Sequence, residues 1–304
     1  MQNKDAISGV LVIDKPTGMT SHDVVNAVRR GTGIRRVGHT GTLDPRASGV
    51  LVILVGPAVR LSEYISASDK RYQAIIRMGT ATDTYDAEGA FTRDEVPVDV
   101  TEEQFDAELK KFEGEIEQTP PAYSAVKVGG RKAYEMARKG EKVELEPRMI
   151  QVHHLEVLEW ATPEVVVDVH CSSGTYIRSL ANDLGEVLGC GAYLVGLRRT
   201  KNGRFSLRDS TPLRKLEESF ERGDWYKHLI PAAESLSDWP SIVLDADGVE
   251  TIRHGQRLKV EADHPEDEMV RGISEADELV ALMKKVEGAD GGFEWQPKKV
   301  FLIG

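Results

Sequence analysis

The sequence is poor in cysteine and has no long apolar run. Its 304 residues include two cysteines, Cys171 and Cys190, and no Cys-x-x-Cys pair, so a disulfide framework is not expected. No apolar stretch approaches the roughly 20 residues that a membrane-spanning helix needs. The start, Met1 to Ala6, carries both charges and does not resemble a secretory signal. These absences predict a cytoplasmic protein without a membrane span.

Several motifs that carry common chemistry are also missing. The chain has no Gly-x-x-x-x-Gly-Lys-Ser/Thr loop, no Gly-x-Gly-x-x-Gly after a strand, no Gly-x-Ser-x-Gly elbow and no His-Glu-x-x-His pair. Asp83, Asp86 and Glu88 lack the spacing of a calcium loop. His153 and His154 are adjacent on a predicted strand, so their rings are expected to point apart and to make a poor metal pair.

A net positive charge, which nucleic-acid-binding proteins usually carry, is absent, because the formal net charge is −11. The acidity lies in two segments: 93–118 has 10 acidic and 3 basic residues, and 241–304 has 14 and 8. The rest holds 26 acidic and 28 basic residues. Three basic clusters there are ordinary solvated charge or, taken together, a path for a phosphate backbone: Arg29, Arg30, Arg35 and Arg36; Lys127, Arg131 and Lys132; Arg198, Arg199, Lys201 and Arg204.

Apolar residues make up 40% of the chain, which is sufficient for a buried core, and its length fits two domains. We place the boundary after Trp239 and Pro240, which gives domains 1–240 and 241–304, with an insertion at about 118–147. Residues 208–240 are expected to be loosely structured. Strands and helices alternate irregularly, which predicts an α+β core: strands at 9–13, 50–55, 71–78, 149–159, 164–171 and 192–198, and helices from about 20, near 59–65, 101–112, 131–139, 177–188 and 246–254.

Three stretches are candidates for a functional site. Asp44 lies in the glycine-dense run GHTGTLDPRASG at 38–49, where a carboxylate can be both exposed and fixed, although most Asp-Pro pairs only form turns. Tyr72 is either a core tyrosine or a stacking platform for an unstacked base. Arg178 stands in the first turn of a predicted helix, where the helix dipole opposes a cation, so either an anionic partner or simple surface exposure is expected. Cys171, just before this helix, is expected to be a buried apolar residue.

The same stretches, with others, resemble one known family. The run at 38–49 closely resembles the signature of the bacterial tRNA pseudouridine synthase B family. So do five further motifs, which occur in the family's order over about residues 7–200: GVLVIDKPTGMTS at 9–21, DKRY at 69–72, PPAYSAVK at 120–127, CSSGTYIR at 171–178 and LRR at 197–199. The resemblance implies a mixed, mostly antiparallel catalytic sheet with a thumb-like insertion and a small β-rich C-terminal domain of the PUA type.

The resemblance also implies roles for individual residues. Asp44 matches the catalytic aspartate, and Arg178 matches the arginine that pairs with it. Tyr72 matches the tyrosine that packs on the target base. The other matched residues are implied to bind substrate or to support the site: His39, which helps displace the base; Tyr176 and Leu197, which line the uracil pocket; and Lys15 with Pro16, a supporting motif.

The implied reaction converts uridine 55 in the tRNA T loop to pseudouridine. It gains and loses no atoms and involves no redox change, so neither a cofactor nor a metal is expected. The base must first leave its stack, and a charged arginine near Asp44 would favour the ionised carboxylate. The resemblance leaves open whether Asp44 attacks C1′, attacks C6 or removes a sugar proton. The expected partner is the tRNA T stem-loop, bound by a monomer without guide RNA or protein partner.

Three alternatives remain open from the sequence. The first is a noncatalytic protein that binds or folds tRNA on the same scaffold. The second is a metal-dependent hydrolase that uses His39 and Asp44, although the ligand spacing is missing. The third is a guide-RNA-dependent relative, against which the insertion at 118–147 argues. Arg46 adds a charge beside Asp44, and the acidic tail from 241 matches the family less clearly than the rest.

Overall fold

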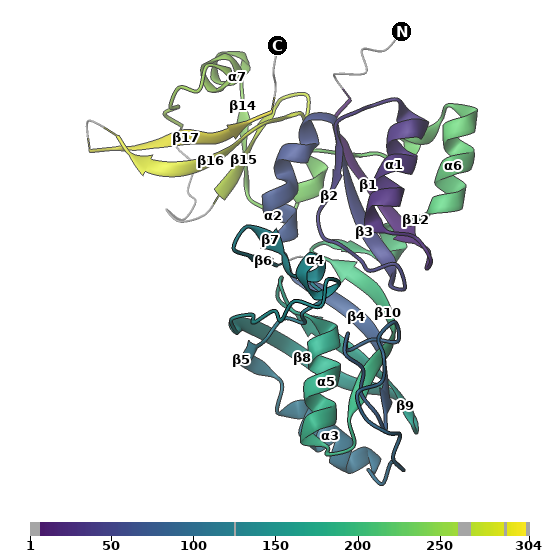
Figure 1. The fold of residues 1–304 in the computed structure, drawn as a ribbon. Helices are drawn as coiled ribbons and strands as arrows, with labels where there is room; N and C mark the ends of the chain where they lie inside the picture. The colour runs from purple at the N-terminus through teal and green to yellow at the C-terminus, as the bar shows by residue number, and fades with distance from the viewer. Residues whose placement is uncertain (1–6, 125, 261–268, 289–290, 302–304) are drawn as a thin grey trace.

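The computed structural model describes residues 7–124, 126–260, 269–288 and 291–301. Its main feature is a sheet in the order β12-β1-β3-β10-β4-β9-β8-β5, with β2 beside β3, β11 beside β10 and β13 beside β1 (Figure 1). The strands are β1 (Gly9–Lys15), β2 (Val37–His39), β3 (Ser48–Val55), β4 (Lys70–Met78), β5 (Gly114–Gln118), β8 (Arg148–Ala161), β9 (Glu164–Cys171), β10 (Ala192–Asn202), β11 (Phe205–Ser206), β12 (Thr211–Pro212) and β13 (Ile230–Pro231).

The pairing of these strands is mixed. β1 with β12 and β3 with β10 are parallel, and the other neighbours in this sheet are antiparallel. Because adjacent antiparallel strands need only short connections, β8 follows directly into β9 along the chain. The prediction of an α+β protein with a mixed, mostly antiparallel sheet is confirmed.

Four helices share one apolar core with this sheet: α1 (Ser21–Thr32), α3 (Glu102–Lys110), α5 (Ile177–Val187) and α6 (Leu213–Arg222). The beginning of α1 is fixed by Thr20, whose side chain accepts a hydrogen bond from the Asp23 backbone while the Asp23 carboxylate accepts one from the Thr20 backbone. The helix ends at Gly33, which has a left-handed conformation. These sequence signals explain why the N-terminal helix was predictable.

The central strands β1 and β3 are buried on both faces. Leu11 and Ile13 of β1 face the helical core, whereas Val10 and Val12 belong to a second apolar cluster on the opposite face. That second cluster is covered by η2 (Gly56–Leu61), α2 (Ser62–Ser66) and part of the C-terminal sheet. Burial on both faces explains why these strands read as continuous apolar runs.

Gly49 is a position where the fold tolerates no side chain. Its φ is +98°, and a Cβ there would lie 2.2 Å from the backbone oxygen of Arg199, the residue it pairs with on β10. We expect Gly49→Ala to lower the free energy of unfolding by at least about 3 kcal/mol, from backbone strain and this clash. Urea denaturation measures the loss. Gly189→Ala is the matched control, because Gly189 has φ +77° but open space around it, and a loss of about 1–2 kcal/mol is expected. Equal losses would contradict the steric explanation.

A second sheet forms the C-terminal part of the chain. Its strands, in the order β14-β15-β16-β17, are β14 (Ser241–Leu244), β15 (Met269–Ser274), β16 (Leu279–Glu287) and β17 (Phe293–Val300), and α7 (Ala246–Arg253) packs with them in a third core cluster. Figure 1 shows this sheet beside α2. Arg271 donates to the backbone oxygens of Trp239 and Ala233 at 3.0 and 2.8 Å, and Lys299 donates to that of Arg60 at 3.0 Å. The small β-rich C-terminal unit is thus confirmed, and its assignment to the PUA type stays a prediction.

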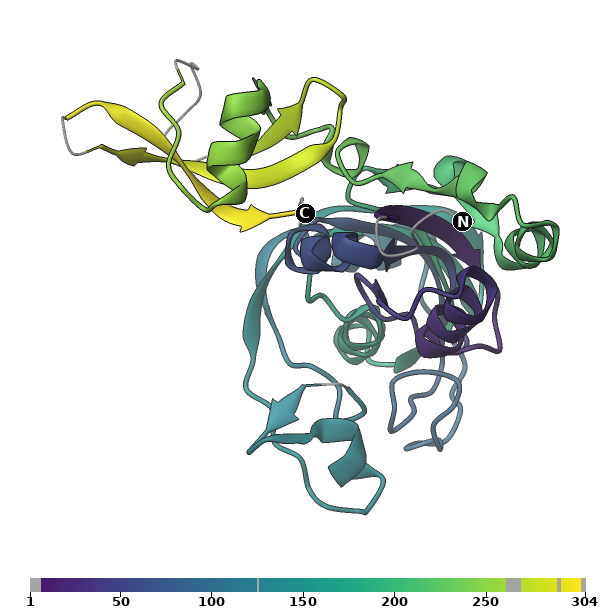
Figure 2. The same ribbon diagram turned by 90° about the horizontal axis from the view of Figure 1, so that it is seen from above.

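The predicted insertion lies between β5 and β8. It contains a hairpin of β6 (Lys127–Val128) and β7 (Arg131–Lys132), followed by α4 (Ala133–Ala137). Figure 2 shows this hairpin and α4 standing away from the main sheet. Among the helices in the described parts of the chain, none has the length and apolarity of a membrane span.

The prediction of a loose segment at 208–240 was wrong. This stretch contains α6 and two short strands, β12 and β13, that pair with β1. It also contains the 3₁₀ helices η4 (Trp225–His228) and η5 (Glu234–Leu236), and η3 (Leu207–Asp209) overlaps its start. Helix α6 buries Leu213 and Leu216 in the helical core and ends at Gly223 in a left-handed conformation. The segment is mostly charged, but its few apolar residues lie on one face, so it forms an amphipathic helix.

Candidate active site

Asp44 stands in a well-fixed loop between β2 and β3. The hydroxyl of Ser21 donates to the backbone oxygen of Leu43 at 3.0 Å and accepts from its backbone nitrogen at 2.8 Å. On the other side, the backbone N–H of Gly18 donates to the oxygen of Pro45 at 2.8 Å. The Asp44 side chain nevertheless stays 47% exposed. The loop therefore holds the carboxylate in place and leaves it open to a ligand.

Arg178 connects Asp44 to two further groups. Its Nη2 lies 3.3 Å from Oδ2 of Asp44, and its Nη1 lies 3.1 Å from Oδ2 of Asp86. Nη2 also donates to the backbone oxygen of Tyr123, in the insertion, at 3.1 Å. The side chain is 12% exposed and stands in the first turn of α5, where the helix dipole is unfavourable for a cation. The two carboxylates offset that effect, so the predicted anionic partner of Arg178 is present within the chain.

Asp86 is a residue of this site that the sequence did not reveal. In the sequence, Asp86 stands out only beside Asp83 and Glu88, whose spacing does not fit a calcium loop. In the structure its Oδ1 accepts from the hydroxyl of Thr84 at 2.6 Å and from the backbone of Glu88 at 3.0 Å, which leaves Oδ2 for Arg178. Asp86 and Arg178 are 92 positions apart, and no local pattern links them.

One pocket brings the charged groups together with an apolar wall. Asp44, Asp86 and Arg178 line it with Leu197 and Leu194 of β10. A register shift between Leu194 and Gly196 interrupts the β10–β4 pairing here. Such a bulge redirects side chains, and this one coincides with the place where the loop holding Asp86 attaches to β10. Leu197 thus lines the same pocket as Asp44, and its contact with a uracil base stays a prediction.

Tyr72 and Arg199 are neighbouring buried side chains close to Asp44. Tyr72, Ala74 and Ile76 alternate toward the core as predicted, and Tyr72 is 9% exposed. Burial raises the pKa of the Tyr72 phenol, which the positive charge of Arg199 partly opposes, so the phenol stays protonated near neutral pH. Arg199 is 1% exposed and donates to the backbone oxygens of Val50 and Gly41 at 2.7 and 3.1 Å. Placing Arg199 in a phosphate-binding cluster was therefore wrong.

Lys15 supports the Asp44 loop from inside the protein. Its side chain is fully buried, and Nζ donates to the backbone oxygens of Met19, Pro16 and Pro45 at 2.6, 2.9 and 3.4 Å. Burial lowers the pKa of Lys15 to about 8, and the nearby charge of Asp44 opposes this shift. The contacts thus attach the Lys15-Pro16 turn to the residue after Asp44. A direct role of Lys15 in substrate binding stays a prediction.

Tyr176 is fixed by a residue at the base of the insertion. The side chain of Gln118, buried at the end of β5, accepts from the Tyr176 backbone N–H at 2.8 Å and donates to its backbone oxygen at 3.1 Å. The Ser179 hydroxyl also donates to the backbone oxygen of Thr119 at 2.8 Å. The start of α5, with Arg178, is therefore attached to the insertion.

Cys171 ends β9, shortly before α5, and is buried. Burial raises the pKa of its thiol to about 12, which agrees with the prediction that it is not a nucleophile.

His39 lies at the end of β2, where its Nδ1 accepts from the backbone N–H of Gly41 at 3.3 Å. Burial, with the positive charge of Arg199 and His22, lowers the pKa of His39. Unfolded chains bind this proton near pH 6.5. Because the folded state binds it only at lower pH, the unfolded state holds more protons below pH 6.5, and stability must fall as the pH is lowered.

We therefore expect His39→Gln to lose less stability than the wild type between pH 7 and pH 5. The free energies of unfolding of the two proteins should diverge by up to about 1.4 kcal/mol per pH unit, which is the slope for one bound proton. Urea denaturation at a series of pH values measures it. His254→Gln, at an exposed position after α7, serves as the control and should follow the wild type. An unchanged slope in His39→Gln would contradict the assignment.

The hydrolase hypothesis receives no support from this geometry. In the described parts of the chain, the residues that could jointly hold a metal ion are Asp69, His153 and His170, and neither His39 nor Asp44 belongs to that group. The site at Asp44 is instead a carboxylate held by a guanidinium beside a buried phenol.

Comparison with known proteins agrees with the resemblance. Residues 29–177 match the model of the TruB family pseudouridylate synthase (N-terminal domain), and 178–236 match the tRNA pseudouridylate synthase B C-terminal domain. Proteins named tRNA pseudouridine synthase B are 41% identical in Solibacter usitatus, covering 91% of this chain and 95% of that one, and 45% identical in Symbiobacterium thermophilum, covering 84% and 85%.

Solved structures show the same relationship at a greater distance. A Cbf5-Nop10-Gar1 complex contains a chain that is 29% identical, with a TM-score of 0.75 over 97% of this chain and 85% of that one. A chain from an H/ACA RNP bound to a substrate RNA containing 2′-deoxyuridine is 28% identical, with a TM-score of 0.74 and the same coverage. With the sequence match over most of its length and the shared fold, the chain belongs to the TruB family of pseudouridylate synthases.

Proposed function

We propose that this protein converts uridine 55 in the T loop of tRNA to pseudouridine. The observation that carries the proposal is the ion pair between the exposed Asp44 carboxylate and Arg178, in a pocket lined by Leu197. The names of the relatives described above support tRNA as the substrate. The choice of uridine 55 rests on the resemblance of the motifs at 9–21 and 38–49 to the bacterial family.

The reaction breaks the bond between C1′ and N1, turns the base and forms a bond between C1′ and C5. The hydrogen of C5 is lost and N1 gains one, so the atoms balance without a co-reactant. Asp44 supplies the carboxylate that attacks C1′ or C6 or removes a sugar proton. Arg178 pairs with that carboxylate and orients it, and Tyr72 presents its ring to the flipped base. His39, Tyr176 and Leu197 surround the base in this proposal.

The two-domain division and the partners are part of the proposal. The catalytic domain would span 1–240 and a PUA-like domain 241–304, and the change from one sheet to the other at Ser241 supports this boundary. The enzyme would act as a monomer in the cytoplasm, with the insertion closing over the T stem-loop. Independence from guide RNA is supported by the higher identity to the relatives named tRNA pseudouridine synthase B, 41–45%, than to the chains from the H/ACA RNP and the Cbf5-Nop10-Gar1 complex, 28–29%.

The test is conversion of an unmodified tRNA transcript by the purified protein without guide RNA. Carbodiimide labelling followed by primer extension maps any pseudouridine. Conversion of uridine 55 alone is expected, and a transcript with cytidine at that position should remain unlabelled. Binding without conversion would favour the tRNA-folding alternative, and conversion only with an added guide RNA would favour the guide-dependent one. Labelling at another uridine would overturn the choice of position.

A further inference from the structure

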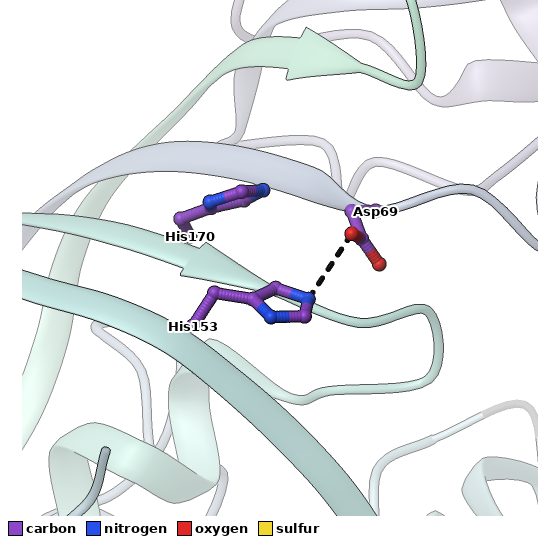
Figure 3. Close-up of side chains that lie close together, drawn as sticks. All are labelled: Asp69, His153 and His170. Carbon is purple, nitrogen blue, oxygen red and sulfur yellow. Dashed lines mark ion pairs between the residues drawn. The ribbon is translucent and has the colours of Figure 1, made fainter. Parts of the chain in front are cut away.

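A group of two histidines and an aspartate lies outside the candidate active site. Asp69, His153 and His170 each direct one side-chain ligand atom into a common space, with these atoms within 4.8 Å of one another. Nε2 of His153 lies 3.1 Å from Oδ2 of Asp69, and the ring centroids of His153 and His170 are 4.7 Å apart. Figure 3 shows the two rings and the carboxylate converging, with the ion pair between His153 and Asp69.

The three residues come from three adjacent parts of the main sheet. Asp69 directly precedes β4, His153 lies on β8 and His170 lies on β9, which pairs with both. The register of β8 and β9 shifts between Val152 and His154, so His153 is the extra residue of a bulge. Because of this bulge, the ring of His153 contacts the ring of His170 on the neighbouring strand. The metal-ligand pair is therefore formed between two strands, and not by the adjacent residues His153 and His154.

This group lies on the opposite face of β4 from the candidate active site. Tyr72 and Ala74 of β4 point into the helical core, and so do Val169 and Cys171 of β9. Because side chains alternate along a strand, His170, between the last two, points to the other face. All three side chains are at least partly exposed, His153 at 34% and Asp69 at 48%, so solvent reaches the group.

We propose that Asp69, His153 and His170 bind one late first-row transition-metal ion, for which Zn²⁺ is the test ion. Two imidazoles and one carboxylate are a common ligand set for such ions, and solvent can supply the remaining ligand. Ligand atoms about 2.1 Å from one tetrahedral ion lie about 3.4 Å apart, close to the 3.1 Å between His153 and Asp69. The ligand atom of His170 lies within 4.8 Å of the other two, so the ion would have to draw it closer.

The surroundings of the group are compatible with a cation. Arg71 and Lys201 lie near His170, but Arg71 is held by Asp168, with Nε 2.8 Å from Oδ2. The carboxylates of Asp69 and Asp168 therefore balance the two cations, Arg71 and Lys201. No excess positive charge is left to repel a metal ion.

The proposed ion would stabilise the sheet and take no part in the reaction. It would connect the start of β4 to β8 and β9, three residues before Tyr72 and on the face opposite to it. A ligand that binds the folded state alone raises the melting temperature in proportion to the logarithm of its concentration. The site therefore has readouts that do not depend on pseudouridine formation.

The test is calorimetric titration of the full, metal-free chain with Zn²⁺ at pH 7.5, together with Co²⁺ absorption spectra. One ion per chain is expected, with Co²⁺ absorption bands typical of histidine coordination and a higher melting temperature in Zn²⁺. His153→Gln, His170→Gln and Asp69→Asn should each weaken the Zn²⁺ affinity at least tenfold. His154→Gln is the matched control on the same strand, and its affinity should stay within twofold of the wild type.

Two results would overturn the proposal. The first is the absence of stoichiometric binding by the wild-type chain. The second is a pattern of losses that does not follow the three proposed ligands. An unchanged affinity in His170→Gln would place bound Zn²⁺ elsewhere, for example at Glu250 and His254 on the C-terminal unit, and a loss in His154→Gln as large as in His153→Gln would make His154 a ligand. Because the substituted side chains are partly exposed, the variants should fold, and circular dichroism of each metal-free variant verifies this before titration.

Discussion

Replacing Asp44 by asparagine is expected to abolish conversion of the tRNA transcript while leaving tRNA binding within about threefold. The amide keeps the size and part of the hydrogen bonding of the carboxylate, but it supplies neither a nucleophile nor a negative charge for Arg178. Removing the reacting group of an enzyme that relies on one side chain lowers kcat by roughly 10⁴-fold or more. Single-turnover conversion measures this, and filter binding measures affinity.

The matched control is Asp94→Asn, which makes the same chemical change at an exposed position of the acidic segment. It should convert tRNA at the wild-type rate. The stability of Asp44→Asn should also change little, because the Asp44 side chain is half exposed and its loop is held by Ser21, Lys15 and Gly18. Residual conversion by Asp44→Asn within tenfold of the wild type would show that another group reacts with the substrate.

The parts of the site that could be predicted lie within continuous motifs. Asp44 and Lys15 belong to glycine- and proline-rich turns that are unusual in composition, and Tyr72 belongs to a strand whose alternation is plain. In each case the local sequence determines the local conformation. The resemblance to a family then supplied the roles, which composition and periodicity alone did not indicate.

The parts that could not be predicted depend on long-range packing. Asp86 reaches Arg178 only because its loop attaches to the bulge of β10, and that bulge is specified by the pairing of strands far apart in the sequence. Arg199 looked like a surface cation, but the parallel pairing of β10 with β3 buries it against Gly41 and Val50. A charged residue is assigned to the surface by default, and only its backbone partners show otherwise.

The charges around Asp44 are mainly positive, although the protein as a whole is acidic. Arg178 lies between Asp44 and Asp86, and Arg199 and Lys15 lie beneath the Asp44 loop. Cations this close attract the Asp44 carboxylate more strongly than the net charge of −11 repels it, because exposed charges beyond about 10 Å are screened by salt. Asp86 contacts the Arg178 guanidinium on the side away from its contact with Asp44, through Nη1 where Asp44 contacts Nη2.

The second large effect is therefore expected at Arg178. Arg178→Met should lower kcat by about 10²–10³-fold, because it removes the charge that stabilises Asp44 and leaves Asp86 partly buried without its partner. Arg178→Lys should recover only part of this loss, since a lysine ammonium cannot contact both carboxylates and the Tyr123 oxygen in the fixed geometry of a guanidinium. Single-turnover rates at saturating tRNA separate this effect from binding.

Asp86→Asn distinguishes positioning from direct catalysis. If Asp86 acts only by holding Arg178, its loss should lower kcat by about 10-fold in the wild type and add almost nothing in Arg178→Met, a coupling that a double-mutant cycle measures. The hydroxyl of Thr84 and the backbone of Glu88 can still donate to the amide oxygen of the substituted side chain, so a folding defect is not expected. Fully additive losses would mean that Asp86 contributes to the reaction on its own. In that case the aspartate missed by the sequence would be a second reacting carboxylate, and the mechanism would need two acidic groups where the family signature shows one.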